Sequence, residues 1–517
     1  MFFVYSLIFS TGLINIFEDL FQGEIRSWNK SQIILLHLFS LFTPVNKIYK
    51  VNKNIKRCFN YFFASKSKLN PLKDDVYELQ KNISDIQGRD LKESLLKYYY
   101  ENDFLDLTLT FIDGHVIAYF GKESFQKLKH STRNAIMKSM EVFNFSDRRG
   151  RIFYFRADHD VEGMQKNIEI LLSDVQRVIG LDKVKILVFD RGGFSHELFN
   201  KLNSKFKLKF ITLAVQNSNV KRQIDIILKN NSFKSLSRKS EKEYIICSLE
   251  IGATKYRTLL IRNRCDKKVH SFITNMSLEE LTNEKLIQHY SMHWNQEQEH
   301  NAFGKIGGNM HSKAMQETEF EDTTKIKNAI KISNRIEKLT SKYIQLEQEL
   351  KRIEGLKISL TSKIKPKSKQ TDNKIVRKQV NDYNNRSVFI SNNLEEINDE
   401  INKLKKRLAK IPETPMKKKF KFGPVDYSIS ITNLANNLNS KLVEIATNGK
   451  EKFQLSTLLG SFYSIQAHVC EDEDNIYVEY FNIRQQKQIN MVQNLCNHFN
   501  PKNIKLRTKT LNFSIKS

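Results

Sequence analysis

The pattern of apolar and polar residues predicts a sheet in the middle of the chain. Residues 105–113 alternate with period two, and a second short strand is expected at 117–121 and a third at 151–156. The stretch 183–189 ends in a continuous apolar run from Ile186 to Phe189, which is typical of a strand that is buried on both faces. A further apolar run at 208–215 predicts another strand of the same sheet.

Helical periodicity separates and follows these strands. Residues 161–179 carry apolar side chains on one helical face, and Ser195 is a suitable N-cap for a helix after the 183–189 strand. Strands followed by helix, strand, helix and strand predict a mixed α/β sheet. Residues 235–275 are strand-like again and suggest an inserted β meander, after which residues 284–303 return to helix.

The segments on either side of the predicted sheet have different patterns of apolar and charged residues. Residues 1–100 alternate apolar and basic stretches and predict helices, which form either a small DNA-binding bundle or a packing layer. Residues 326–411 contain two heptad stretches around a basic linker, which predicts an antiparallel helical hairpin, with a parallel dimer zipper as the alternative. Near the end, helices are expected at 431–446 and 453–466 and a strand at 475–481.

At 517 residues the chain is long enough for about three domains. The patterns divide it into four regions: a helical N-terminal region (1–100), an α/β core with the meander (101–315), a helical hairpin with a basic linker (316–415) and a mixed α/β C-terminal region (416–517).

Charge and cysteine content narrow the choice of partner and compartment. The 84 Lys and Arg residues exceed the 57 Asp and Glu residues by 27, which favours a polyanionic partner, most simply nucleic acid. A Lys-rich composition without any partner is the alternative. The five cysteines never form a CxxC pair, which argues against a zinc ribbon and a disulfide framework and fits a reducing cytoplasm. Residues 1–17 are uncharged but shorter than the roughly 20 residues of a membrane span, so a buried amphipathic helix is expected there, with membrane insertion as the alternative.

Three acidic residues are candidates for metal chemistry. Asp113 and Asp190 each follow an expected strand, and Tyr290, Trp294 and Glu297 share one face of the helix after the meander. A carboxylate beside two aromatic side chains on a packing face is costly unless something compensates its charge. Magnesium, which prefers a few carboxylate oxygens plus phosphate, would do so. Two such ions about 4 Å apart can activate an attacking oxygen and stabilise a leaving oxygen at phosphorus.

Simpler interpretations exist for each of these residues. A single Asp after a strand is more often a turn residue or a helix cap, although three in this order favour a site. Glu299 is an alternative to Glu297, and Asp158 begins an Asp-His-Asp stretch that is either a metal site or, more simply, a solvated helix start. Arg191 either contacts DNA or pairs with an acid, and His115 either orients Asp113 or is an ordinary turn residue.

Two of the acidic stretches resemble motifs of a known family. The run from Ile112 to Val116, Ile-Asp-Gly-His-Val, resembles the first-Asp motif of one subgroup of the DDE transposases of bacterial insertion sequences. The run Phe189-Asp-Arg-Gly192 resembles the second-Asp motif. The resemblance covers about residues 100–315 and implies an RNase H-like (retroviral-integrase-like) catalytic core with the β meander as an insert.

The third acidic stretch is similar to the signature Y-(2)-R-(3)-E-(6)-K of the same family. Tyr290 and Glu297 stand at the Tyr and Glu positions. His293 stands where the family has Arg, and Gly304 stands at the Lys position, with Lys305 directly after it.

The resemblance implies an activity, its cofactor and its partners. Two Mg²⁺ or Mn²⁺ ions would be bound by Asp113, Asp190 and Glu297. DNA would be contacted by Tyr290, His293, Lys305 and Arg191. Water and then a DNA 3′-hydroxyl would attack phosphorus, so that the ends of an insertion sequence are cleaved and transferred to a target. The implied partners are double-stranded DNA, as terminal inverted repeats and target, and a second copy of the chain in a synaptic complex. No membrane contact is expected, and the implied location is the bacterial cytoplasm at the nucleoid. A metal-dependent nuclease of the same fold and a DNA-binding protein that has lost catalysis are the alternatives.

Overall fold

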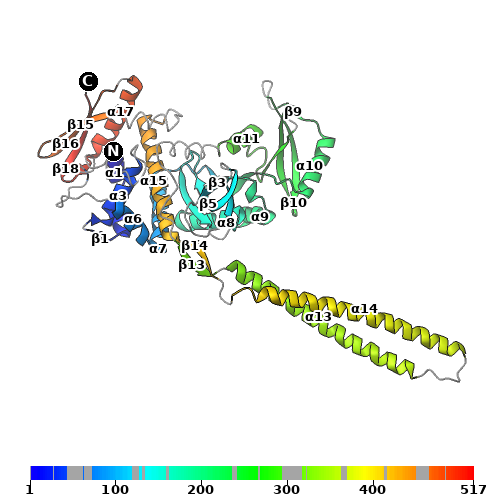
Figure 1. Ribbon diagram of the computed structural model, residues 1–517. Helices are drawn as coiled ribbons and strands as arrows, with labels where there is room; N and C mark the ends of the chain where they lie inside the picture. Colours follow the sequence, from blue (N-terminus) through cyan, green and yellow to red (C-terminus); the bar gives the residue numbers. More distant parts are fainter. Residues whose placement is uncertain are drawn as a thin grey trace. The chain divides into compact units, whose positions relative to one another are not determined.

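The computed structural model describes residues 2–26, 28–42, 62, 73–118, 127–130, 134–158, 162–235, 241–265, 268–293, 317–321, 323–362, 370–412, 416–449, 465–483 and 485–516 (Figure 1). The chain forms two compact units, one of Met1–Glu317 with Phe420–Ser517 and one of Thr318–Lys419. The N-terminal helices, the α/β core and the C-terminal region therefore share the larger unit.

A mixed sheet forms the centre of the larger unit and confirms the expected α/β class. Its described strands, in spatial order, are β4 (Lys127–His130), β5 (Ala135–Ser146), β3 (Leu109–Ala118), β7 (Ile186–Phe189), β8 (Lys209–Leu213), β12 (His270–Thr274), β11 (Thr254–Asn263), β10 (Lys242–Ile251) and β9 (Lys234–Ser235), with β6 (Ile152–Asp158) also paired to β5. Strand β7 pairs in parallel with β3 on one side and with β8 on the other. The other pairings are antiparallel.

The prediction that a strand ends at Asp113 is wrong. The two short strands expected around it are one continuous strand, β3, which pairs with β5 from Phe111 to Ala118. Gly114 has a different reason to be glycine. A Cβ atom there would lie 2.9 Å from Oε1 of Glu141 and 3.1 Å from the ring of Phe143. Cross-strand crowding therefore explains this glycine, because both neighbours project from β5 over the backbone of β3.

Helices cover both faces of the sheet. The helix expected at 161–179 is present as α8 (Met164–Ile179), and its apolar face is fully buried in the same core cluster as Leu187 and Phe189 of β7. Helix α11 (Asn283–Ser291) covers the other face, where Leu286 lies in one cluster with Val188 of the same strand. Helix α11 ends at Ser291, with Met292 as its C-cap, and is therefore shorter than the helix expected at 284–303; residues 294–316 lie outside the described residues.

The expected meander is a continuation of the central sheet. Strand β12 pairs with β8, so that Leu213 lies opposite Phe272. Helix α9 (His196–Ser204) follows β7 and β8 follows α9, as the sequence predicts. Helix α10 (Ser218–Asn230), which contacts β10, was not expected.

One long helix packs against the sheet and against segments from both ends of the chain. Helix α15 (Phe422–Ala446) begins before the expected residue 431 and is buried along most of its length. It contacts β6 and, in Figure 1, lies beside the N-terminal helices α1 (Phe2–Ser10), α3 (Lys30–Leu41), α6 (Lys73–Asn82) and α7 (Asp85–Glu101). Helix α2 (Leu13–Leu20) and the short strands β1 (Glu24–Ile25) and β2 (Trp28–Asn29) complete this region.

The N-terminal apolar segment lies inside the larger unit. Residues Phe3, Leu7 and Ile8 of α1 are buried, which confirms the expected buried helix. Among the described helices, none alone has the length and apolar character needed to cross a membrane. Helices α1 and α2 meet that requirement only when taken together, and they are bent by 74° relative to each other.

The C-terminal region is a small α/β layer. Its sheet has the order β15 (Gln466–Glu471), β16 (Asn475–Phe481), β18 (Lys509–Ile515) and β17 (Lys505–Leu506), and it carries helix α17 (Gln486–Phe499) and the turn η3 (Asn500–Lys502). Strand β16 matches the expected strand at 475–481. The helix expected at 453–466 falls mostly outside the described residues, and Gln466 belongs to β15.

The second unit is the helical hairpin. Helices α13 (Thr323–Thr361) and α14 (Gln370–Leu408) pack antiparallel along the heptad positions, with Leu339 against Ile397 at one level and Ile353 against Ile390 at another (Figure 1). Strands β13 (Glu317–Glu321) and β14 (Met416–Phe420) pair where the hairpin begins and ends.

Candidate active site

Asp190 lies where β7 ends, as the sequence predicts. The chain turns at once through a single 3-10 turn, η2 (Arg191–Gly193), and Ser195 then caps α9 by accepting a hydrogen bond of 3.4 Å from the Leu198 amide. A Cβ atom at Gly193 would lie 2.8 Å from Cδ1 of Ile168, so a larger residue would not fit in this turn. The side chain of Asp190 remains 45% exposed and is therefore accessible to a ligand.

Asp113 lies next to Asp190 in the sheet. Strands β3 and β7 are parallel, and their last matched pair is Ile112 with Phe189. Asp113 and Asp190 are the next residue on each strand, so they are neighbours at one level of the sheet, where adjacent strands lie about 4.8 Å apart.

Both carboxylates project from the same face of the sheet. Side chains alternate along a strand, and Asp113 has the parity of Phe111, as Asp190 has the parity of Val188. Phe111 and Val188 belong to the cluster beneath α11. The parallel pairing of β3 and β7 therefore brings together two of the three acids singled out from the sequence, on the face that α11 covers.

Tyr290 of α11 links the helix to this pair. Its hydroxyl donates a hydrogen bond of 3.2 Å to Oδ1 of Asp190, and its ring is 8% exposed. Burial raises the pKa of Tyr290, and the negative charges of Asp190 and Asp113 raise it further. The hydroxyl therefore stays protonated at neutral pH and acts as a fixed donor to the carboxylate.

Arg191 and His293 lie at the margin of the site. The Nε atom of Arg191 is 3.9 Å from Oδ1 of Asp190, and the Arg191 side chain is 60% exposed. Nδ1 of His293 is 3.0 Å from the carbonyl oxygen of Tyr290, and the two rings are 5.2 Å apart. Arg191 thus lies beside Asp190 and is placed to meet an incoming anion, whereas His293 packs against Tyr290.

The remaining predicted site residues, Trp294, Glu297, Gly304 and Lys305, lie outside the described residues. Within the described ranges, no group of three or more His, Cys, Asp or Glu residues could hold a metal ion. Two adjacent carboxylates on one face are nevertheless the hard oxygen donors that Mg²⁺ takes, since this ion is usually bound by one or two carboxylates plus phosphate oxygens and water. The residues present therefore fit a magnesium or manganese site.

No family model matches the sequence. No curated protein shows significant similarity to it either. Function is therefore inferred from the geometry of the site and from the motifs in the sequence.

Asn144 is a site residue that the sequence did not reveal. It lies opposite Asp113 on β5, is 2% exposed, and its Oδ1 has no hydrogen-bond partner among the described residues. A buried amide oxygen without a partner is costly, and a nearby cation or water would satisfy it. The signal in the sequence is the alternation of apolar and polar residues at 135–146, which is typical of a strand such as β5.

Asp158 has a structural role rather than the solvated position expected for it. It is fully buried at the end of β6 and accepts hydrogen bonds from Nδ2 of Asn167 at 2.8 Å and from the Gly163 amide at 3.3 Å, where α8 begins. Glu141 lies opposite it on β5, and burial raises the pKa of Glu141, with further contributions from Asp158 and Asp113. His159 and Asp160 lie outside the described residues.

Proposed function

We propose that the protein is a DDE-type DNA transposase, which cleaves the ends of its element and joins them to a target duplex. The observation that carries this proposal is the position of Asp113 and Asp190, side by side on one face of the sheet and bridged to α11 through Tyr290. Two acids on adjacent parallel strands supply the ligand set that two-metal phosphoryl transfer needs, with Glu297 as the proposed third acid.

The order of the strands supports an RNase H-like core. Strands β6, β5 and β3 form an antiparallel meander, and β7 and β8 extend it in parallel, with α8 and α9 as the connections. Such a sheet, with acids on its two central strands, is the arrangement expected of an RNase H-like core, and it supports that part of the proposal. Strands β10 to β12 between this core and α11 then correspond to the β insert of the resembling family.

The side chains have separate roles in this proposal. Asp113, Asp190 and Glu297 would hold two Mg²⁺ or Mn²⁺ ions, which would supply activation of the attacking oxygen and stabilisation of the leaving oxygen at phosphorus. Tyr290 fixes one oxygen of Asp190 and thereby orients the other. Arg191, with His293 and Lys305, would contact DNA phosphates.

Two reactions follow one another at this site. In the first, the oxygen of water bonds to phosphorus and the bond from phosphorus to the 3′ oxygen breaks, leaving a 3′-hydroxyl. In the second, that hydroxyl attacks a phosphorus of the target and displaces its 3′ oxygen. The net charge of +27 supports a DNA partner, because each neutralised phosphate releases a counterion. A homodimer that holds two element ends, at the bacterial nucleoid, belongs to the same proposal.

Cleavage of DNA by the purified full-length chain tests the proposal. Wild-type protein with Mg²⁺ is expected to nick DNA that carries the inverted repeats flanking its gene, whereas Asp190→Asn and Asp113→Asn should abolish nicking. Asp225→Asn is the matched control, because Asp225 is an exposed acid on α10 away from the two central strands. If Asp190→Asn cleaves as well as wild type does, the metal assignment is wrong.

The products of the same reaction separate the alternatives. A cut end joined to a second duplex supports a transposase, and cleavage without joining indicates a metal-dependent nuclease of the same fold. Magnesium-independent binding without cleavage indicates a DNA-binding protein that has lost catalysis.

A further inference from the structure

The two acids belong to a longer row of oxygen-bearing side chains. Asn144 of β5 lies directly opposite Asp113 of β3, and Asp190 follows the last matched pair of β3 with β7. Directly opposite residues of an antiparallel pair project from the same face, with Cβ atoms about 4.5–5.5 Å apart. Asn144, Asp113 and Asp190 therefore stand side by side on three adjacent strands and on one face of the sheet.

Asn144 is the buried end of this row. It is 2% exposed, whereas the side chain of Asp190 is 45% exposed. On the side away from Asp113, Asn144 lies opposite Phe155 of β6, which packs in one cluster with Ile429 of α15. The packing of α15 against this part of the sheet therefore encloses the amide, and Asp113 is its polar neighbour across the strands.

The amide oxygen of Asn144 lies in negative surroundings. Its Oδ1 is buried and accepts no hydrogen bond from the described residues. Burial raises the pKa of Tyr290 and of Glu141, and the negative charge of Asp113 raises both pKa values further. A cation suits an acceptor oxygen in such a place better than a neutral donor does, because it stabilises the amide dipole and the carboxylate together.

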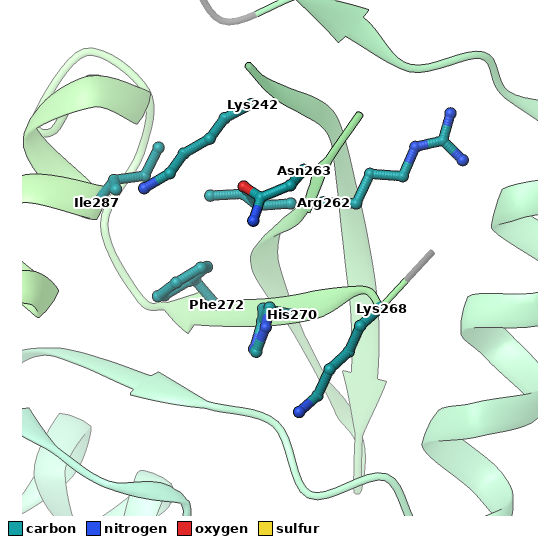
Figure 2. A pocket seen from close by; sticks show the side chains of 8 residues that line it. Lys242, Arg262, Asn263, Lys268, His270, Phe272 and Ile287 are labelled. Atoms are coloured by element: carbon teal, nitrogen blue, oxygen red, sulfur yellow. The ribbon is translucent and has the colours of Figure 1, made fainter. Parts of the chain in front are cut away.

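A second place on this face of the sheet does not suit a metal ion. A hollow of about 180 Å³ lies between the strands β10 to β12 and α11 (Figure 2). The described residues that line it include Lys242 and Lys268 but no carboxylate. Hard divalent cations take oxygen ligands, carboxylates above all. The oxygen donors that such an ion needs are instead gathered in the row of Asn144, Asp113 and Asp190.

The spacing of the row matches a pair of metal ions. Adjacent strands lie about 4.8 Å apart, so three side chains in a row leave two positions between them at about that separation. Two-metal sites for phosphoryl transfer hold their ions about 3.5–4 Å apart. One position lies between Asp190 and Asp113, and the other lies between Asp113 and Asn144.

We propose that Oδ1 of Asn144 is a direct ligand of the second divalent ion, which shares Asp113 with the first. The inference rests on the proposed function, because it takes the acidic pair as a metal site. Carbonyl and carboxylate oxygens both suit Mg²⁺ and Mn²⁺. A neutral amide on the enclosed side adds a ligand without burying a further charge, and it would act together with Glu297.

Mn²⁺ binding by the full-length chain tests this ligand without requiring catalysis. Free Mn²⁺ is measured by electron paramagnetic resonance during a titration, and the relevant binding is that which Asp190→Asn abolishes. Asn144→Leu removes the amide and is expected to weaken this binding about tenfold or more, since loss of a group that merely orients a metal ligand already has such an effect. Asn144→Asp keeps an oxygen at the same position and should bind Mn²⁺ at least as tightly as wild type does.

Asn436→Leu is the matched control. Oδ1 of Asn436 is likewise buried without a hydrogen-bond partner among the described residues, but it lies on α15 and outside the row. The control should keep the wild-type Mn²⁺ affinity. In EDTA, Asn144→Leu should melt no lower than wild type, because an apolar group replaces an unsatisfied buried amide. Asn144→Ala provides the same comparison if leucine prevents folding.

The outcomes separate this ligand from the site as a whole. Unchanged Mn²⁺ affinity in Asn144→Leu, or an equal loss in Asn436→Leu, would overturn the proposal and leave the proposed function standing. Weaker binding in both Asn144→Leu and Asn144→Asp would also overturn it and indicate that the amide donates a hydrogen bond to Asp113. If no Mn²⁺ binding depends on Asp190, the proposed function fails together with the inference.

Discussion

The hydroxyl of Tyr290 donates a hydrogen bond to Oδ1 of Asp190, although the two residues are separated by 100 positions in the sequence. This contact joins α11 to the carboxyl end of β7, where Asp113 lies on the neighbouring strand. A buried aromatic donor that is held by packing fixes the orientation of a half-exposed carboxylate. The contact therefore connects the fold of the core to the proposed chemistry.

Replacing Tyr290 by Phe is expected to slow Mg²⁺-dependent DNA cleavage about tenfold or more. The change removes one hydrogen bond to a charged group, worth about 1.5–3 kcal/mol, and leaves the apolar packing of the ring in place. The measurement is the rate of cleavage at saturating protein. Tyr244→Phe is the control, because Tyr244 packs against the same cluster from β10. Cleavage by Tyr290→Phe at the wild-type rate would show that the contact does not orient Asp190.

His37 makes stability depend on pH. Burial lowers its pKa to about 4, while its Nδ1 lies 3.2 Å from the Tyr427 hydroxyl, and an unfolded histidine titrates near 6.5. The unfolded chain thus takes up the proton first as pH falls. The stabilising contribution is complete above about pH 6.5 and is lost progressively towards pH 4.

The measurement is the free energy of unfolding of wild type and His37→Gln across this window. Wild type is expected to lose up to about 3 kcal/mol more than the variant, since each unit of pKa difference is worth about 1.4 kcal/mol. Parallel curves for the two proteins would contradict the assignment of a neutral, buried His37.

Lys92 of α7 and Asp426 of α15 form a buried ion pair with a distance of 3.2 Å, and their side chains are 11% and 8% exposed. Removing one partner leaves an uncompensated buried charge, so Lys92→Met is expected to lower the unfolding free energy by about 3–5 kcal/mol. Lys92→Met/Asp426→Leu should recover much of that loss, because neither charge remains. Urea denaturation of the two single variants and the double variant measures the coupling. Additive losses would show that the pair does not interact.

Gly88 lies where α7 packs closely against α15. A Cβ atom at Gly88 would lie 2.7 Å from Cα of Gly423, which is backbone and cannot turn aside. Gly88→Ala is therefore expected to destabilise the protein by about 1–3 kcal/mol despite the better helix propensity of alanine. Gly355→Ala is the control, since a Cβ atom there meets nothing within 4 Å and should be neutral or stabilising. A lower melting temperature is expected for Gly88→Ala alone.

Local patterns in the sequence were sufficient for the elements that carry Asp190. The apolar run, the glycine turn and the Ser195 cap all lie within about a dozen residues, and the structure has each of them. The heptad positions of 326–411 likewise predict the packing of α13 on α14. In both cases the deciding interactions are between residues close in sequence or repeated at a fixed period.

Interactions between distant segments were not predictable in the same way. The sequence predicts that a strand ends at Asp113, whereas β3 continues through Gly114, where Glu141 and Phe143 from another strand leave no room for a Cβ atom. Asn144 was not predicted as a site residue, because its position opposite Asp113 depends on strand pairing that no local pattern encodes. The adjacency of Asp113 and Asp190 similarly follows from the parallel pairing of β3 with β7.

Anomalous scattering from Mn²⁺ in crystals of the full-length chain tests the central claim most directly. The account predicts manganese density within about 2.2 Å of carboxylate oxygens of both Asp113 and Asp190, and its loss in Asp190→Asn. Manganese bound elsewhere while both carboxylates remain without an ion, or unchanged density in Asp190→Asn, would contradict it.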